Sequence, residues 1–231
     1  MLSRETASEI VSSKGWLRHT TPSFRSAVLE RCLLEHFGAR TPIYAIGDEP
    51  GGLYGLVEGG LGISIAPREL GPYTAHFAMP GTWFGEVAVF TRQPRKVGLT
   101  ATRQTTMLHL PLHRVDEIVD HDPAAWRSFG LLALEHLDLA MGGTDDLMIR
   151  SHVKRFVAVL LRLGDCRVTT PANGRPIDID LNHEELAYMA NVARTTAGAI
   201  LRQLEADGCV KLSYRRICIL APNALRKVLR D

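Results

Sequence analysis

The pattern of apolar positions is clearest near the end of the chain, where it predicts two helices and then two short strands. Asn182 can cap the first helix, and Glu185 can close a capping box with it. After Asn191, a residue type that tolerates a left-handed turn, apolar residues recur at helical spacing. These residues are Val192, Ala197, Ile200, Leu201 and Leu204. Gly208 is placed to end this helix, and alternating residues predict a hairpin over Val210–Ile219.

Two helices with a tight turn and a following hairpin have the outline of a winged helix-turn-helix, a structure that reads DNA. Arg194 and Thr195 begin the second helix on its polar face, and Gly198 on the same face is also expected to contact DNA. Arg194 can donate two hydrogen bonds to guanine, and Thr195 can make a weaker contact. Phosphate contacts are expected from Thr196, Arg202, Arg215 and Arg216. The alternative is an ordinary helical pair in an unrelated core, but turn and wing together favour DNA.

The first half of the chain has a different texture. Residues 1–40 contain amphipathic helical stretches, of which Ser23–Cys32 is the clearest. From Thr41 onward, short alternating segments separated by Gly and Pro predict a small β-barrel or jelly roll. The predicted strands are Ile43–Ala45, Leu53–Val57, Leu61–Ile65, Thr74–Phe77, Lys96–Thr102 and Thr106–Leu110.

From Asp122 the pattern becomes helical, and apolar residues cover nearly the whole circumference of the helix. Such a helix needs partners on two sides. We expect the barrel on one side and a second copy of the helix on the other, which gives a twofold homodimer with Leu132 and Leu139 in its seam. The alternative is one helix buried in a monomer. Gly142 and Gly143 are expected to weaken the helix and let it bend.

These patterns predict an α+β chain of three parts. Residues 1–121 form an effector-sensing barrel, 122–150 a dimerisation helix and hinge, and 151–231 the winged helix-turn-helix. Residues 151–231 hold 13 Lys and Arg against 8 Asp and Glu, net +5, whereas residues 1–150 are net −3. The basic excess accompanies the predicted DNA reader, as phosphate binding requires.

Composition narrows the class of protein further. The 231 residues are 45% hydrophobic and 23% charged, which is typical of a soluble globular protein. No apolar run approaches a membrane span of about 18 residues, and the N-terminus lacks the layout of a signal peptide, so we expect a cytoplasmic protein without membrane contact. The four cysteines are scattered, which fits a reducing compartment and argues against a zinc or iron–sulfur site.

Barrel, long helix and winged helix in this order resemble the superfamily of the cyclic-AMP receptor protein and the fumarate-nitrate regulator, which are bacterial transcription factors. The resemblance covers nearly the whole chain. The residues that carry it are Gly47-Asp48, Leu53-Tyr54 through Gly59, Gly85–Phe90 through Pro94-Arg95, and Leu186-Ala187 through Gly208. It implies a sequence-specific DNA-binding regulator rather than an enzyme, with operator DNA, a second copy and RNA polymerase as partners.

The segment from Gly85 to Arg95 resembles the phosphate-binding cassette of this superfamily. A short helix there can present backbone N–H groups to an anion, Glu86 can bind a ribose hydroxyl, and Arg95 can pair with a phosphate. The expected effector-binding residues are Gly85, Glu86, Val87, Arg95 and Lys96.

Two departures argue against cyclic AMP as the effector. Lys96 stands where nucleotide-binding members usually carry Ser or Thr, and Ala140-Met141, near the expected position of the base, offers no hydroxyl. The cassette then binds a different small anion or cyclic nucleotide, with Lys96 adding positive charge. The alternative is a structural corner in which Glu86 and Arg95 satisfy each other or the backbone.

Two rival functions remain open. A cupin-type metalloenzyme with a helical tail would need a His-x-His pair in the barrel, and the sequence has none. His76 stands alone there, so we expect no metal, haem or catalytic residue. The second rival is a binding module whose DNA reader is vestigial; DNA binding distinguishes it.

Overall fold

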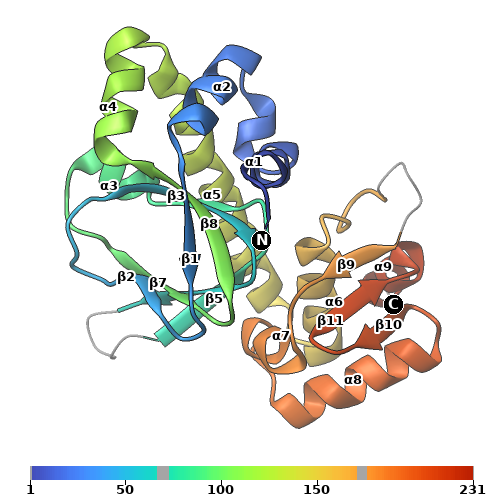
Figure 1. The fold of residues 1–231 in the computed structure, drawn as a ribbon. Coiled ribbons are helices and arrows are strands. Elements are labelled where there is room, and N and C mark those ends of the chain that lie inside the picture. Colours follow the sequence, from blue (N-terminus) through green and yellow to red (C-terminus); the bar gives the residue numbers. More distant parts are fainter. Residues whose placement is uncertain (1, 67–72, 171–175, 231) are drawn as a thin grey trace. The chain divides into compact units, whose positions relative to one another are not determined.

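The computed structural model describes residues 2–66, 73–170 and 176–230, and the contacts of the chain group into two compact units (Figure 1). The N-terminal unit is Met1–Leu137 and the C-terminal unit is Asp138–Asp231. The division falls within one continuous helix, α5 (Ala125–Met148). The next helix, α6 (His152–Leu163), begins close to the predicted domain boundary at residue 150.

Two four-stranded sheets build the N-terminal unit, with strand orders β1-β8-β3-β6 and β2-β7-β4-β5 and antiparallel pairing within each sheet. The strands are β1 (Leu33–Phe37), β2 (Pro42–Tyr44), β3 (Gly52–Glu58), β4 (Leu61–Ile65), β5 (Tyr73–Ala78), β6 (Trp83–Phe84), β7 (Val97–Ala101) and β8 (Thr105–Pro111). The predicted β-domain of an α+β chain is confirmed. The pattern missed β1, whose sequence does not alternate, and β6, which is only two residues long.

Alternate residues of β3 serve two different cores. Leu56 packs between the sheets in a cluster that includes Leu61, Leu99 and Met107. Leu53 and Val57 point to the other face, as the two-residue period of a strand requires. There they share a cluster with residues of α1 (Arg4–Ser13), α2 (Pro22–Arg31), α4 (Leu112–His121) and the first turns of α5, and with Trp16, Leu17 and Val89.

The start of α5 is anchored in this second core by aromatic packing. Phe129 meets the ring of Phe24 edge-on at a centroid distance of 4.9 Å, and Trp16 lies within 5.9 Å of Phe129. Leu132, one turn further along, is fully buried. The helix then continues through Gly142 and Gly143 without a break and ends at Met148, so the two glycines do not terminate it.

The C-terminal unit packs four helices against a three-stranded antiparallel sheet of order β10-β11-β9. Its remaining elements are β9 (Ile177–Ile179), α7 (His183–Met189), α8 (Arg194–Ala206), β10 (Val210–Ser213), β11 (Arg216–Ile219) and α9 (Pro222–Arg230). The predicted winged helix-turn-helix is confirmed. Sequence reasoning missed β9 and α9, which complete the sheet and the helical layer.

Local chemistry explains where the two predicted helices begin and end. The side chain of Asn182 accepts from the N–H of Glu185, and the Glu185 carboxylate accepts from the N–H of Asn182 at 2.8 Å, so the capping box forms. Asn191 takes the left-handed conformation with φ of 50°, and Gly208 ends α8 with φ of 68°. These local predictions are correct.

A close backbone approach in β3 gives a first prediction. A Cβ atom on Gly55 would lie 2.6 Å from the ring of the fully buried Trp83, so Gly55→Ala is expected to lower the free energy of unfolding by about 1–3 kcal/mol. Gly98→Ala in β7 is the matched control, because its Cβ would stay 3.5 Å from the nearest atom. Urea titrations of both variants measure the effect; equal losses would contradict the packing argument.

Candidate functional site

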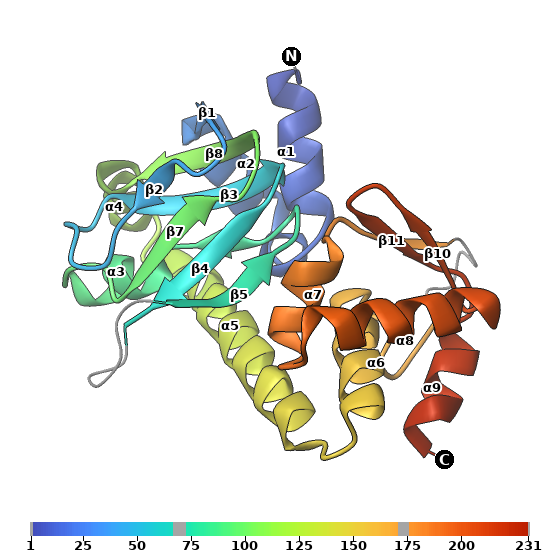
Figure 2. The same cartoon turned by 90° about the horizontal axis from the view of Figure 1, so that it is seen from below.

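A groove of about 690 Å³ opens on the C-terminal unit, between the start of α7, one face of α8 and the tip of the β10–β11 hairpin. Its lining residues are Asn182, His183, Glu184, Arg194, Thr195, Gly198, Arg202, Ser213, Tyr214 and Arg215. Figures 1 and 2 show α8 along the outside of this unit, with the hairpin beside it. A protruding helix beside a basic arm is a shape that the major groove of DNA admits.

Helical spacing gives α8 two different faces. The face toward the unit is buried and apolar; it consists of Ala197, Ile200, Leu201 and Leu204. The other face brings Arg194, Thr195, Gly198 and Arg202 to the groove. A Cβ atom on Gly198 would make only an ordinary contact, 3.5 Å from the Arg202 guanidinium, so space alone does not require glycine there. Arg194, Thr195 and Arg202 on this face are exposed.

Arg194 at the first turn of α8 is poised for a ligand. Its side chain is 77% exposed and lies 3.9 Å from a carboxylate oxygen of Glu184, which is 73% exposed. An exposed pair of this kind stabilises a protein little, so Arg194 can turn to a base edge at small cost.

The tip of the hairpin contributes an aromatic ring that sequence reasoning missed. Tyr214 is 91% exposed, and the guanidinium of Arg215 lies 5.9 Å from the centre of its ring. Arg215 has φ of 55°, which turns the loop tightly. The available signal was the aromatic residue itself, because turn positions normally hold small polar residues.

Two of the expected DNA contacts lie outside this groove. Arg216 points to β9, where its Nε donates to Asp180 at 2.9 Å and its Nη1 lies 3.6 Å from Asp178. The hydrogen bond to Asp180 and the charges of both carboxylates raise the pKa of Arg216. Thr196 is half-buried on the flank of α8. Arg216 is therefore paired with carboxylates within the sheet, and the phosphate contact expected from it stays a prediction.

The cassette in the N-terminal unit forms a second candidate site. Gly85 caps the short helix α3 (Glu86–Thr91) with φ of 110°. A Cβ atom at Gly85 would lie 2.3 Å from the carbonyl oxygen of Gly52, so this corner requires glycine. Glu86 at the helix start is 7% exposed.

Arg95 is buried beneath this corner and is held by the backbone. Its Nη2 donates to the carbonyl of Gly52 at 3.0 Å and its Nη1 to that of Gly85 at 3.4 Å. The guanidinium also lies over the ring of Tyr44, 4.1 Å from the centroid. Burial raises the pKa of the Tyr44 hydroxyl despite the nearby positive charge of Arg95.

The partner of Glu86 comes from α5 and was also missed. His136 Nδ1 lies 2.7 Å from Glu86 Oε1, and the imidazole stacks on Phe84 at a centroid distance of 5.3 Å. Burial acts to lower the pKa of His136, but the hydrogen bond and charge of Glu86, together with Glu135, outweigh it and raise that pKa. Glu86 and Arg95 thus satisfy different partners, rather than each other.

Three buried polar atoms around the cassette have no hydrogen-bond partner within the described part of the chain. They are the Nε of Arg95, the hydroxyl of Tyr44 and the Nε2 of His136. Val87 and Lys96 lie outside this polar cluster, because both side chains are exposed. The positive charge expected from Lys96 therefore lies at the surface, and its part in effector binding stays a prediction.

Other kinds of site receive no support from the described residues. Among residues 2–66, 73–170 and 176–230, no group of three or more His, Cys, Asp or Glu could hold a metal ion. The four cysteines are unpaired thiols, three of them buried. No helix in the described part of the chain is both long and apolar enough to span a bilayer.

Comparisons with known proteins agree with this two-part architecture. Residues 34–122 match the cyclic nucleotide-binding domain family, and residues 154–228 match the Crp-like helix-turn-helix domain family. The transcriptional regulator LdrP of Thermus thermophilus is 26% identical over 204 residues, which cover 84% of this chain and 95% of LdrP.

Solved structures share the fold at lower identity. FixK2 from Bradyrhizobium japonicum superposes with a TM-score of 0.69 at 16% identity, covering 85% of this chain and 96% of its own. A CRP-family transcriptional regulator from Thermus thermophilus gives 0.61 at 23% identity, covering 85% and 97%. With both domains matched in this order, the chain belongs to the CRP/FNR family of transcriptional regulators.

Proposed function

We propose that the protein is a homodimer that binds operator DNA through the α8 groove under the control of a small effector. The observation that carries the proposal is the groove itself, in which the free face of α8 and the hairpin tip line one open surface. The net charge of +5 over residues 151–231 favours phosphate as the partner. A regulator of bacterial operators works in the cytoplasm, where we place it.

Within the groove we assign different tasks to different residues. Arg194 reads a guanine through two hydrogen bonds, and Thr195 beside it makes a less selective base contact. Arg202 and Arg215 bind phosphates, which sets register and affinity. Tyr214 extends the phosphate-contacting edge at the hairpin tip. Thr196 flanks the reading face and is half-buried, so we assign it only a phosphate contact at the margin of the groove.

The second copy is proposed to pack along α5. Large exposed side chains follow this helix at spacings of three, four and seven residues: Leu134, Leu137, Met141 and Met148. Such spacing forms a narrow apolar stripe that a second helix covers. Leu132 and Leu139, which the sequence placed in the seam, lie roughly on the opposite side at about 100° per residue. The fully buried Leu132 belongs to the core of the N-terminal unit, so the seam is corrected.

Effector control is proposed to act at the cassette of Gly85, Glu86 and Arg95. The unpartnered atoms of Arg95, Tyr44 and His136 are groups that a polar ligand would satisfy. A ligand that bonds to Glu86 Oε1 competes with His136 for that oxygen. Since His136 belongs to α5, such a ligand acts on the proposed dimerisation helix. An effector changes the position of α8 only if it binds two conformations of the protein with different affinities.

The rival functions differ in what they require. A cupin-type metalloenzyme needs several convergent metal ligands, and the two matched domain families do not favour it. A regulator with a vestigial reader would bind no DNA selectively, which the first experiment below measures. Contact with RNA polymerase stays an expectation from the family resemblance.

The DNA proposal predicts separate roles for two arginines. Arg194→Ala should weaken binding to an operator by about 1–3 kcal/mol and leave random DNA nearly unaffected. Arg202→Ala should weaken both and reduce the slope of log affinity against log salt by about one. Arg216→Ala is the control, because Asp178 and Asp180 hold this arginine. Fluorescence anisotropy over a salt series measures the affinity of each variant for operator and random DNA. The operator is first selected from a pool of random duplexes. Equal losses on both DNAs would remove Arg194 as a base reader.

The dimer proposal predicts that charge in the apolar stripe separates the subunits. The double variant Leu137→Glu, Met141→Glu should sediment as a monomer, because two like charges would face each other across the seam. Leu147→Glu is the control; it is also exposed but lies about 100° off the stripe. Sedimentation velocity distinguishes the two. A dimer that survives the double change places the interface elsewhere.

The His136–Glu86 pair predicts a pH-dependent stability of the N-terminal unit. Because the folded state raises the pKa of His136, the stability from this pair is fully present below the unfolded pKa and is lost as pH rises through the folded value. The destabilisation caused by His136→Gln should therefore be larger at pH 5.5, near or below the ordinary histidine pKa of about 6.5, than at pH 9. His113→Gln, an exposed histidine of α4, is the control. Equal effects of His136→Gln in urea titrations at both pH values would refute the assignment.

A further inference from the structure

Arg155 of α6 bonds to the backbone at two places in the C-terminal unit: the link between α5 and α6, and the turn between α7 and α8. All three guanidinium nitrogens of Arg155 donate to backbone carbonyl oxygens: Nε to Ala190 at 2.7 Å, Nη1 to Ile149 at 2.8 Å and Nη2 to Asn191 at 3.1 Å. The side chain is half-buried. Three of its N–H groups are thus used inside the protein.

One of the three carbonyls lies in the link that precedes α6, and the other two lie in the turn of the helix-turn-helix. Ile149 lies in the short link between α5 and α6, Ala190 caps the end of α7, and Asn191 is the left-handed residue of the turn. Carbonyls at helix ends lack partners within their own helix. The planar fork of Arg155 satisfies both joints at once, so it fixes the turn relative to the end of α5.

Buried ion pairs also hold the junction between α5 and α6. Asp146, near the end of α5, is fully buried and accepts from Arg162 Nε at 2.6 Å and from Arg167. A Cβ atom on Gly142 would lie 3.0 Å from the Arg162 side chain, so this glycine lets the arginine cross α5. The end of α5 is therefore tied to α6, and Arg155 continues that connection to the turn.

We propose that Arg155 is a positioning residue that sets the direction of the reading face of α8. The proposal rests on the DNA-binding function given above. Since α8 begins at Arg194, three residues after Asn191, loosening the turn displaces the base-reading arginine first. Arg155 itself need not touch DNA.

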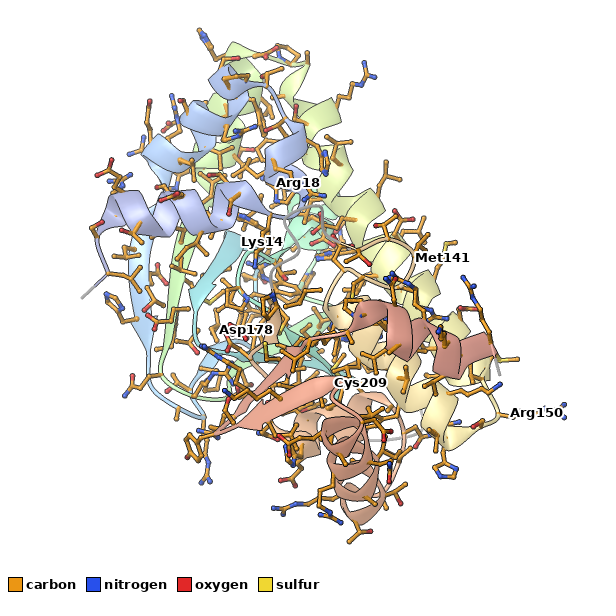
Figure 3. The ribbon with its side chains drawn as sticks, turned by 90° about the vertical axis from the view of Figure 1, so that its right-hand side faces the viewer. Lys14, Arg18, Met141, Arg150, Asp178 and Cys209 are labelled. Atoms are coloured by element: carbon orange, nitrogen blue, oxygen red, sulfur yellow. The ribbon has the colours of Figure 1, made fainter. Side chains whose placement is uncertain are left out.

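The test compares Arg155→Lys and Arg155→Gln with Arg150→Gln. Lysine keeps the charge but carries one nitrogen, which cannot replace a three-way fork. Arg150 is exposed and extends away from the ribbon in Figure 3, so its change removes one charge near the same link without these bonds. Anisotropy over a salt series gives the operator-to-random affinity ratio, and circular dichroism with thermal melting verifies folding.

Positioning predicts that both Arg155 variants lose about tenfold in the operator-to-random ratio, roughly the value of one lost base contact, with an unchanged salt slope. Arg150→Gln should keep the ratio. A wild-type operator-to-random ratio in Arg155→Lys would mean that Arg155 makes a phosphate contact, and so would a salt slope that is reduced in Arg155→Gln alone. Either result would overturn the proposal. A lower melting temperature with an intact ratio at 25 °C would mean a purely structural role and would overturn it too.

Amide exchange tests the same proposal without DNA. The N–H of Val192 bonds to the carbonyl of Ala187 at 3.0 Å, and that of Asn191 to Tyr188 at 3.0 Å. Both amides should exchange faster in Arg155→Lys than in the wild type and in Arg150→Gln. If wild-type protein selects no operator, the proposed function fails while these rates still decide the role of Arg155; unchanged rates would overturn it. Arg155→Lys serves where Arg155→Gln does not fold.

Discussion

Carbonyl groups at helix ends need donors, and arginine side chains meet that need at joint after joint of this protein. The Nη2 of Arg4 lies within hydrogen-bond distance of three carbonyls at the end of α2, and the Nε and Nη2 of Arg25 donate to three carbonyls in and after the short 3-10 helix η1 (Trp16–His19). Arg155 does the same at the two joints of the reader. A guanidinium suits this task because its fork of N–H groups reaches several acceptors at once. The apolar cores hold each layer together, while these arginines bond the ends of successive elements to one another.

The two candidate sites depend on the sequence in different ways. The DNA groove is largely local: the capping box at Asn182, the left-handed Asn191 and the i, i+4 face of α8 lie within some 25 residues, and each obeys a short-range rule. The sequence therefore predicts its elements and most of its lining. The cassette is a meeting of distant segments, since Glu86 and Arg95 find His136 and Gly52 only after folding. Spacing along the chain carries no signal for such partners.

The same difference between local and tertiary signals limits how well individual residues within the predicted elements can be placed. Arg216 is as basic as Arg215, but β9 places Asp178 and Asp180 beside it, and β9 is a three-residue strand with little pattern of its own. Leu132 is as apolar as Leu137, yet the barrel covers one face of α5 and leaves the other exposed. A helix that is apolar all round indicates two packing partners, but its sequence does not show which residue contacts which partner. Tertiary contacts, rather than periodicity, decide how such residues are placed.

Helix α5 holds the residues on which three parts of the proposed regulation rest. His136 bonds to Glu86 of the cassette, the exposed stripe from Leu134 to Met148 is the proposed contact with a second copy, and Asp146 binds the end of the helix to α6. At about 1.5 Å per residue, the ten residues from His136 to Asp146 span roughly 15 Å of unbroken helix. Gly142 lies in this stretch where the Arg162 side chain crosses α5, and the helix does not break there. In the function proposed above, a ligand at Glu86 would act on α5 through His136, whereas Asp146 and Arg155 bind the other end of the helix to α6 and to the turn before α8.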